Sequence, residues 1–305
     1  MAANQPEQWK GYAWALIGTI SFSSLYIFSK AGLNQVDLAQ FGLYYFGVGF
    51  LLNLLLVLFS GKIKEIRQLS GEVLKLLLVL AFLDLLSNIT FFMAIRAISD
   101  PSVTSFLGNL FPVFLTLMGV IFLKERFSII EAFGGILAIT GAFVISYSGE
   151  LEWSKFFIPG TGLVVINPLL AATFSVIIKK NVKMASPEVF NLNSNAWIFM
   201  CFLGYFIWSG QPLAIPAKAF QNIALGALFG SFLGLLSFFY SYRFIAASRS
   251  SIVQSLKGIF VLIIAYFFFG NFPLAIQLWG GGIIMIGVLV MTFAQAGLIR
   301  VGEKR

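Results

Sequence analysis

The sequence contains no histidine and a single cysteine, Cys201, among its 305 residues. Without histidine, the chain lacks the commonest metal ligand and the side chain that titrates nearest neutral pH. One cysteine permits no disulfide within the chain. No glycine-rich phosphate loop of the Walker or dinucleotide-binding type is present either. The sequence therefore predicts no metal and no cofactor, and it argues against an enzyme.

Charge is scarce as well. Only 10% of the residues are charged, against about a quarter in a soluble domain, while 59% are hydrophobic and 35 are phenylalanine. Because lipid-facing surfaces must be as apolar as the interior, this composition predicts an all-α integral membrane protein. The net charge of +8 does not indicate a nucleic-acid partner, because the basic residues lie between hydrophobic runs.

Hydrophobic runs of about 20 residues are long enough to cross a bilayer as helices. Ten such runs are predicted as transmembrane helices: Tyr12–Ser29, Phe41–Phe59, Val73–Ile95, Ser102–Leu123, Ile129–Tyr147, Gly162–Ile178, Phe190–Trp208, Ile223–Tyr242, Ser250–Phe269 and Ala275–Gly297. With ten spans, one side of the membrane holds 15 Lys and Arg residues and the other holds 4. The positive-inside rule then predicts that both termini are cytoplasmic.

Two halves of the chain resemble each other. The stretch "FFMAIRAISDPSV" (Phe91–Val103) matches "FFYSYRFIAASRSS" (Phe238–Ser251) at an offset of 147, and "FGGILAITG" (Phe133–Gly141) matches "WGGGIIMIG" (Trp279–Gly287) at 146. The steady offset predicts two repeats of five helices. Because five is odd, the second repeat enters the membrane inverted, which is an architecture of alternating-access transporters.

The chain resembles the drug/metabolite transporter superfamily, of the ten-helix type with two EamA repeats. The stretches Phe111–Ile145 and Gly258–Met291 carry the resemblance, together with the "LKER" turn at Leu123–Arg126. The second repeat departs from this turn, since Asn271 stands where Glu125 would align. We expect the repeats to cover residues 11–148 and 160–297.

The resemblance implies that the first, third, fourth, sixth, eighth and ninth helices surround a central cavity. It also implies that the fifth and tenth helices lie behind it, where glycines allow close packing. The glycines concerned are Gly134, Gly135, Gly141, Gly280, Gly281, Gly282 and Gly287.

Polar residues inside the spans form stripes on the helices that the resemblance places around the cavity. Each larger polar group must face protein or water. The candidate substrate-binding residues are Tyr26, Asp84, Asn88, Asn109, Tyr240, Gln254 and Lys257. Other members of the stripes are Asn167 and the smaller Thr19, Ser23, Ser87, Ser105, Thr116, Thr173, Ser231 and Ser237. The hydroxyls of these serines and threonines are alternatively explained by bonds to their own helix. Pro112 is expected to kink the fourth helix.

A charged residue near the membrane centre costs roughly 2.5–3.5 kcal/mol on insertion scales, so Lys257 needs an explanation. Lys257 either binds an anionic substrate group, pairs with Asp84, or extends to the cytoplasmic surface. Asp84, about 16 Å deep at 1.5 Å per residue, is the candidate proton-coupling residue, since burial disfavours its charged form. Arg243 and Arg249 are expected at the cytoplasmic mouth.

The stretch "VFNLNSNAW" (Val189–Trp197) holds three asparagines near a helix start. They are interpreted as capping and interfacial residues. A faint similarity to the paired asparagines of nucleotide-sugar transporters is the other interpretation.

The sequence thus predicts a secondary transporter in the bacterial plasma membrane. Its substrate is expected to be a small polar, zwitterionic or anionic metabolite, such as an amino acid, moved by alternating access, with Asp84 as the candidate for proton coupling. A sugar-phosphate or nucleotide-sugar exchanger and a non-transporting membrane scaffold are the alternatives. The expected partners are the substrate and the lipid bilayer, and the sequence leaves a monomer or a homodimer open.

Overall fold

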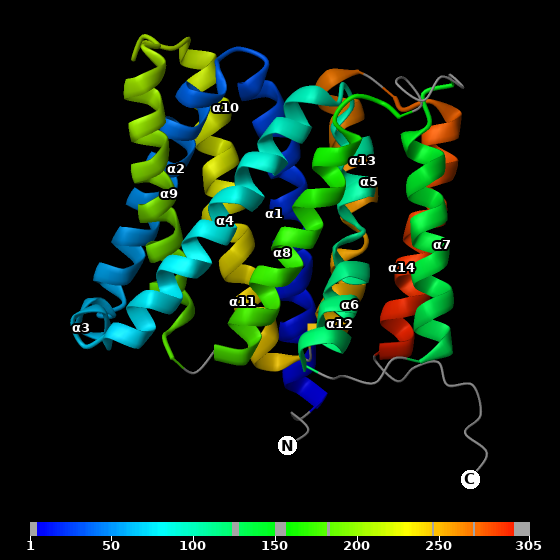
Figure 1. The fold of residues 1–305 in the computed structure, drawn as a ribbon, viewed down its shortest axis with the longest axis horizontal. Coiled ribbons are helices and arrows are strands. Elements are labelled where there is room, and N and C mark those ends of the chain that lie inside the picture. Colours follow the sequence, from blue (N-terminus) through cyan, green and yellow to red (C-terminus); the bar gives the residue numbers. More distant parts are fainter. Residues whose placement is uncertain are drawn as a thin grey trace.

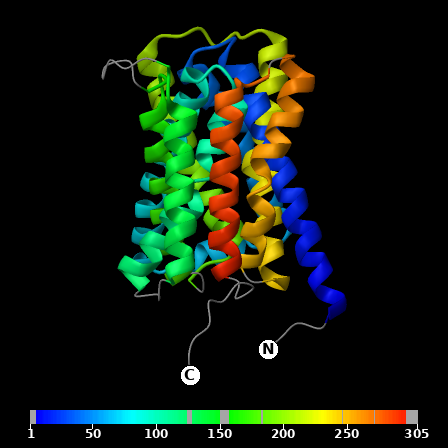
Figure 2. The same cartoon turned by 90° about the vertical axis from the view of Figure 1, so that its right-hand side faces the viewer.

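A computed structural model describes residues 5–123, 128–149, 157–181, 184–245, 247–270 and 272–295. The described part of the chain is a bundle of helices, with one isolated antiparallel bridge between Tyr147 and Phe157. Helix α1 begins and helix α14 ends on the same side of the bundle (Figures 1 and 2). An even number of crossings is consistent with that arrangement.

Ten segments cross the bundle. Seven are single helices: α1 (Gln5–Leu33), α2 (Leu38–Phe59), α4 (Gly71–Ala97), α7 (Ile129–Ser146), α8 (Thr161–Asn181), α9 (Pro187–Ser209) and α14 (Ala275–Gln295). Three are composite: α5 (Pro101–Gly108) with α6 (Phe111–Leu123); α10 (Ala217–Ala227) with the π-helix η1 (Leu228–Gly234) and α11 (Leu235–Phe244); and α12 (Ala247–Gln254) with α13 (Lys257–Phe269). The short helix α3 (Ile63–Arg67) lies in the connection between α2 and α4.

Within the described residues, nine of these segments are long and apolar enough to cross a membrane. The tenth, α9, has 23 residues, a length of about 34 Å at 1.5 Å per residue. The first half of α9 contains Asn191, Asn193 and Asn195. These polar residues lower its mean hydropathy, so α9 is not one of the nine apolar segments. The all-α membrane fold predicted from the sequence is confirmed.

The crossings form three groups (Figure 1). Helices α2 and α9 pack together at one end of the bundle, and α7 and α14 pack together at the other. Between them lie α1, α4, α5/α6, α8, α10/η1/α11 and α12/α13. These are the six crossings that the family resemblance placed around the centre.

Glycines bring α7 and α14 into backbone contact. A Cβ atom added to Gly134 would lie 2.6 Å from the carbonyl oxygen of Gly287, and one added to Gly141 would lie 2.7 Å from that of Gly280. Gly280 follows Gly134 by 146 residues, as Gly287 follows Gly141. The two contacts are therefore related by a pseudo-two-fold axis that exchanges the repeats.

The fourth and ninth crossings are both broken, at positions 146 residues apart. The fourth turns at Asn109 and Leu110, just before Pro112, which agrees with the predicted kink. The ninth turns at Ser255 and Leu256, so the prediction of one continuous helix over Ser250–Phe269 is wrong. There the Ser255 hydroxyl donates to the Ile252 carbonyl at 2.7 Å, a local bond that competes with the helical ladder.

The eighth crossing differs from its prediction in length and in form. It begins at Ala217 rather than Ile223, and its middle turn is the π-helix η1. A π-helix is rare, and it leaves main-chain groups without their usual partners four residues away. Gly230 and Gly234 allow α1 and α2 to approach it, because a Cβ atom on either glycine would lie within 2.6 Å of a neighbouring side chain.

Candidate functional site

Lys257 is the first residue of α13, directly after the break in the ninth crossing. Its side chain is half-buried, and its Nζ atom lies 5.5 Å from the centroid of the Tyr26 ring on α1. A cation over an aromatic face is attracted by the ring quadrupole. The Tyr26 ring in turn packs edge-on against Phe91 of α4, with centroids 5.1 Å apart.

Asn109 joins the two helix breaks. Its amide Nδ2 donates to the Ser255 carbonyl at 3.2 Å, and the side chain is buried. Next to it, a Cβ atom on Gly108 would lie 2.9 Å from the Tyr26 hydroxyl and 3.8 Å from Lys257 Nζ. The structure therefore brings Tyr26, Asn109 and Lys257 together around the end of α5.

Gln254 and Tyr240 take different positions. Gln254 lies three residues before Lys257 and donates from Nε2 to the Ser250 hydroxyl at 3.3 Å. Tyr240 on α11 packs against Trp14 of α1, with ring centroids 5.3 Å apart. Arg243 and Arg249 have side chains outside the described part of the chain, as does most of the "LKER" turn.

Asp84 and Asn88 form a second polar group, on α4. Asn88 Nδ2 donates to the Asp84 carboxylate at 2.8 Å, and the carboxylate also contacts the Ser194 hydroxyl on α9. Asp84 is half-buried and lies two turns before Phe91 on the same helix, a distance of about 10 Å at 1.5 Å per residue. The aromatic contacts of Tyr26 thus connect the helix face near Asp84 with Lys257.

The structure does not join Asp84 to Lys257. In the described ranges the ion pairs are Lys62–Glu65 and Arg96–Asp37, and both lie outside the middle of the bundle. The Lys257–Asp84 pair, one of the three explanations offered for Lys257, is therefore absent from this conformation.

Several smaller hydroxyls of the predicted stripes bond their own helix. Thr19, Thr116 and Thr173 each donate to the carbonyl four residues earlier. Asn167, beside Pro168 in α8, instead donates across to the Ser87 carbonyl on α4 at 2.8 Å.

A buried amide network was missed by sequence reasoning. It consists of Asn53 on α2, Asn191 and Asn195 on α9, and Ser231 in η1. The three asparagines are 0%, 4% and 5% exposed. The interpretation of Asn191 and Asn195 as capping or interfacial residues is wrong: the N-cap of α9 is Ser186, and both amides point into the bundle. Their i, i+4 spacing was the available signal.

Lys30, one of the four basic residues predicted on the less basic side of the membrane and a member of the polar stripe predicted on the first helix, is buried at the end of α1. Its side chain is only 6% exposed, and its Nζ donates to the carbonyls of Ile95, Arg96 and Ile98 at 2.8, 3.2 and 2.7 Å. These carbonyls end α4 and have no partner within the helix. Lys30 therefore caps α4, and its charge suits the negative end of the helix dipole.

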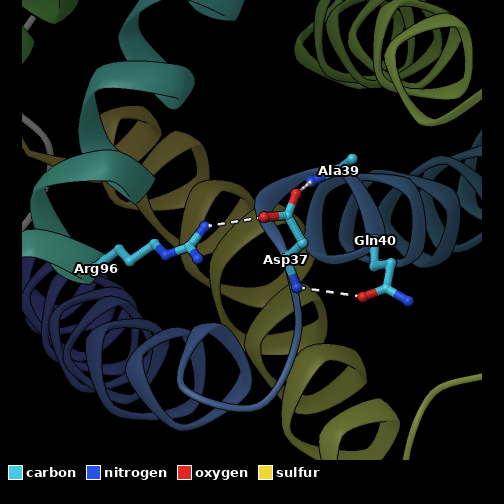
Figure 3. A network of polar contacts seen from close by, with 4 residues as sticks. All are labelled: Asp37, Ala39, Gln40 and Arg96. Carbon is cyan, nitrogen blue, oxygen red and sulfur yellow. Dashed lines mark hydrogen bonds and ion pairs between the residues drawn. The ribbon is translucent and has the colours of Figure 1, made fainter. Parts of the chain in front are cut away.

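Figure 3 shows how the end of α4 is joined to the start of α2, on the side of the bundle away from the start of α1. Arg96 pairs with Asp37 at 3.3 Å, and Asp37 accepts from the Ala39 amide at 3.0 Å as the N-cap of α2. Gln40 completes the capping box and donates from Nε2 to the Pro212 carbonyl at 2.7 Å. On the opposite side, the Ser186 amide donates to Glu65 at 2.6 Å. At each end of the α2–α9 pair, a hydrogen bond thus joins the first half of the chain to the second half.

Among the residues that the structure describes, no three His, Cys, Asp or Glu side chains gather where they could hold a metal ion. The groups available at the middle of the bundle are an ammonium, a carboxylate, amides and aromatic rings. These are groups of the kind that hydrogen-bond or pair with a polar molecule.

Comparison with known proteins agrees with this geometry. The model of the EamA-like transporter family matches residues 9–147 and 158–293. An uncharacterized transporter of Archaeoglobus fulgidus is 26% identical over 193 residues, which cover 62% of this chain and 67% of that protein. The uncharacterized transporter YdfC of Bacillus subtilis is 24% identical over 281 residues, which cover 87% of this chain and 85% of YdfC.

A solved crystal structure that is 14% identical superposes with a TM-score of 0.67, over 94% of this chain and 98% of the other. At that identity the likeness shows the fold alone. The family match, by contrast, spans both halves of the chain and includes the helices that carry the polar groups. The chain is a multi-pass membrane protein that belongs to the EamA-like transporter family.

Proposed function

We propose that this transporter moves a small zwitterionic or anionic metabolite, such as an amino acid, by alternating access and in exchange for a proton carried by Asp84. The observation that carries the proposal is the position of Lys257. It is a half-buried ammonium at a helix break, and within the described residues no carboxylate lies within ion-pair distance of it.

An anionic substrate group suits this position for two reasons. Lys257 supplies a positive charge, and it begins α13, where the helix dipole adds partial positive charge. Broken helices whose ends face the substrate are a recurring feature of transporters built from inverted repeats. The Tyr26 ring beside the ammonium supplies an apolar wall.

Asp84 suits the second charge of a zwitterion or the coupling proton. It is a carboxylate held by Asn88 and Ser194 and not by a base in the described ranges. A substrate ammonium or a proton can therefore neutralise it.

The excess of Lys and Arg on one side supports a plasma-membrane protein with cytoplasmic termini. A reporter enzyme fused after Arg305 should be active in its cytoplasmic form; activity of a periplasmic reporter would contradict this orientation.

Thermal unfolding of the purified protein in the presence of amino acids, organic acids and sugar phosphates tests the substrate class. A ligand at 100 times its Kd stabilises the folded state by about 2.7 kcal/mol. We expect amino acids to raise the unfolding temperature of the wild type and to lose this effect in Lys257→Met. The matched control, Lys218→Met, removes an exposed lysine and should keep the effect. Stabilisation by sugar phosphates alone would favour the exchanger alternative, and equal stabilisation of Lys257→Met would remove Lys257 from the binding site.

A further inference from the structure

The π-helix η1 lies where the eighth crossing meets α2 and α9, and Ser231 is at its centre. All three polar groups of Ser231 are engaged there. Its hydroxyl donates to Asn195 Oδ1 at 2.9 Å, and its carbonyl accepts from Asn191 at 3.1 Å and from Asn53 at 3.4 Å. Its main-chain amide lies against the Tyr45 hydroxyl. A regular α-helix would engage this carbonyl and amide within its own ladder.

The asparagines complete a continuous chain of hydrogen bonds. Asn195 donates to the side-chain oxygen of Asn191 at 3.1 Å, Asn191 donates to that of Asn53 at 2.8 Å, and Asn53 donates to the Gly49 carbonyl at 2.8 Å. A fully satisfied buried network fixes the relative positions of the elements that carry it. Gly49 shows how tightly they fit, because a Cβ atom there would lie 2.5 Å from the Ser231 hydroxyl.

This network ends beside Asp84. Ser194, which contacts the Asp84 carboxylate, is the neighbour of Asn195 on α9 and is buried. The Ser194 hydroxyl therefore reaches the carboxylate from the part of α9 that Ser231 and the asparagines hold in place.

We propose that Ser231, Asn191 and Asn195 are positioning residues for Asp84, which hold Ser194 against its carboxylate and so set the pH range of transport. The proposal rests on the proposed role of Asp84 in proton coupling. The π-helix is the structural device, because its Ser231 carbonyl accepts from Asn53 of α2 and from Asn191 of α9.

Other titratable groups on the helices around Asp84 do not replace this arrangement. Helix α1 carries Tyr26 and Lys30, and the Lys30 ammonium is bound by three carbonyls. Helix α9 carries Glu188 in its first turn, α13 carries Lys257, and α4 itself carries Glu72, Lys75 and Arg96 near its ends. Lys179 and Lys180 of α8 have side chains outside the described part of the chain.

Infrared difference spectra of the reconstituted protein between acid and alkaline pH test the proposal without a substrate. The carboxylic C=O band that is missing in Asp84→Asn belongs to Asp84. Ser231→Ala and Asn195→Ala should move this band to higher wavenumber, because hydrogen bonding to the carboxyl is weakened. They should also shift its titration midpoint about three- to tenfold in proton concentration, the equivalent of one hydrogen bond.

Two matched controls use the same substitutions outside the network. Ser175→Ala removes a hydroxyl that bonds its own helix α8, and Asn181→Ala removes an amide that bonds the same helix. Both should leave the band unchanged. If Asn195→Ala fails to fold, Ser231→Ala still carries the test, since it removes one hydroxyl only.

An Asp84 band that is unchanged in Ser231→Ala and Asn195→Ala overturns the positioning role while leaving Asp84 as the proton site. A spectrum in which no band between about pH 4 and pH 9 depends on Asp84 contradicts proton coupling itself.

Discussion

The Asn109 side chain donates to the Ser255 carbonyl at 3.2 Å, and these residues are separated by 146 positions, the offset of the repeat. Each residue lies in the turn that breaks its crossing. The bond therefore joins equivalent points of the two repeats, next to the Lys257 ammonium. A contact between the repeats at this point is suited to controlling how they move against each other.

Asn109→Ala should lower the free energy of unfolding by about 1–3 kcal/mol, because the buried Ser255 carbonyl loses its partner. It should also reduce transport more than this loss of stability explains. Unfolding and uptake are measured on the same preparation. Asn181→Ala, which removes an amide bonded to its own helix, is the control and should affect neither. Equal behaviour of the two variants would mean that the Asn109–Ser255 bond has no special role.

Gly134→Ala should destabilise the protein by about 1–3 kcal/mol, as overpacking does in a well-packed interior. The added methyl group would meet the main chain of Gly287 and Met291, which cannot rotate away. Gly282→Ala on α14 is the matched control, since nothing lies within 4 Å of its added Cβ atom. Thermal unfolding in detergent compares the two, and a neutral Gly134→Ala would contradict the backbone contact between α7 and α14.

Lys30→Met should destabilise the protein strongly, by about 1–3 kcal/mol for each carbonyl left without a donor or water. Three carbonyls at the end of α4 depend on this ammonium. Lys218→Met removes an exposed lysine and should change stability by less than about 0.5 kcal/mol. Chemical unfolding measures both, and similar stabilities would contradict the role of Lys30 as the cap of α4.

Lys257→Met should abolish transport while the protein remains folded, because the structure gives Lys257 no carboxylate partner in the described ranges. Adding Asp84→Asn in the same chain should not restore transport. The two residues would instead be a structural pair if the double variant recovered folding and transport that the single variant had lost, since no unpaired charge would then remain. Uptake and size-exclusion profiles of the single and double variants distinguish these outcomes.

The membrane fold was predictable from the sequence because long apolar runs admit few other structures. The crossing α4 (Gly71–Ala97) extends the predicted Val73–Ile95 by two residues at each end, where Ser70 caps its start and Lys30 caps its finish. The first of these caps is local and visible in sequence. The second depends on a lysine 65 residues earlier, and its contact with the end of α4 forms only when the two helices pack together.

The candidate site was predictable in part for the same reason. The Lys257 and Asp84 positions followed from the cost of charge in a membrane. The break at Ser255 did not, because Gly258 stands there in the place of Pro112, and a glycine keeps its main-chain amide and does not by itself break a helix. The buried amide network escaped prediction because Asn53, Asn191 and Ser231 are spread over three helices, and only packing brings them together.

The exchange of protons for substrate through Asp84 is tested most directly by following internal pH in proteoliposomes that contain a pH-sensitive dye. The external substrate is an amino acid identified by thermal unfolding. The wild type should show a pH change when the substrate is added, and Asp84→Asn should show none while still exchanging labelled substrate. A pH change of wild-type size in Asp84→Asn would contradict the account.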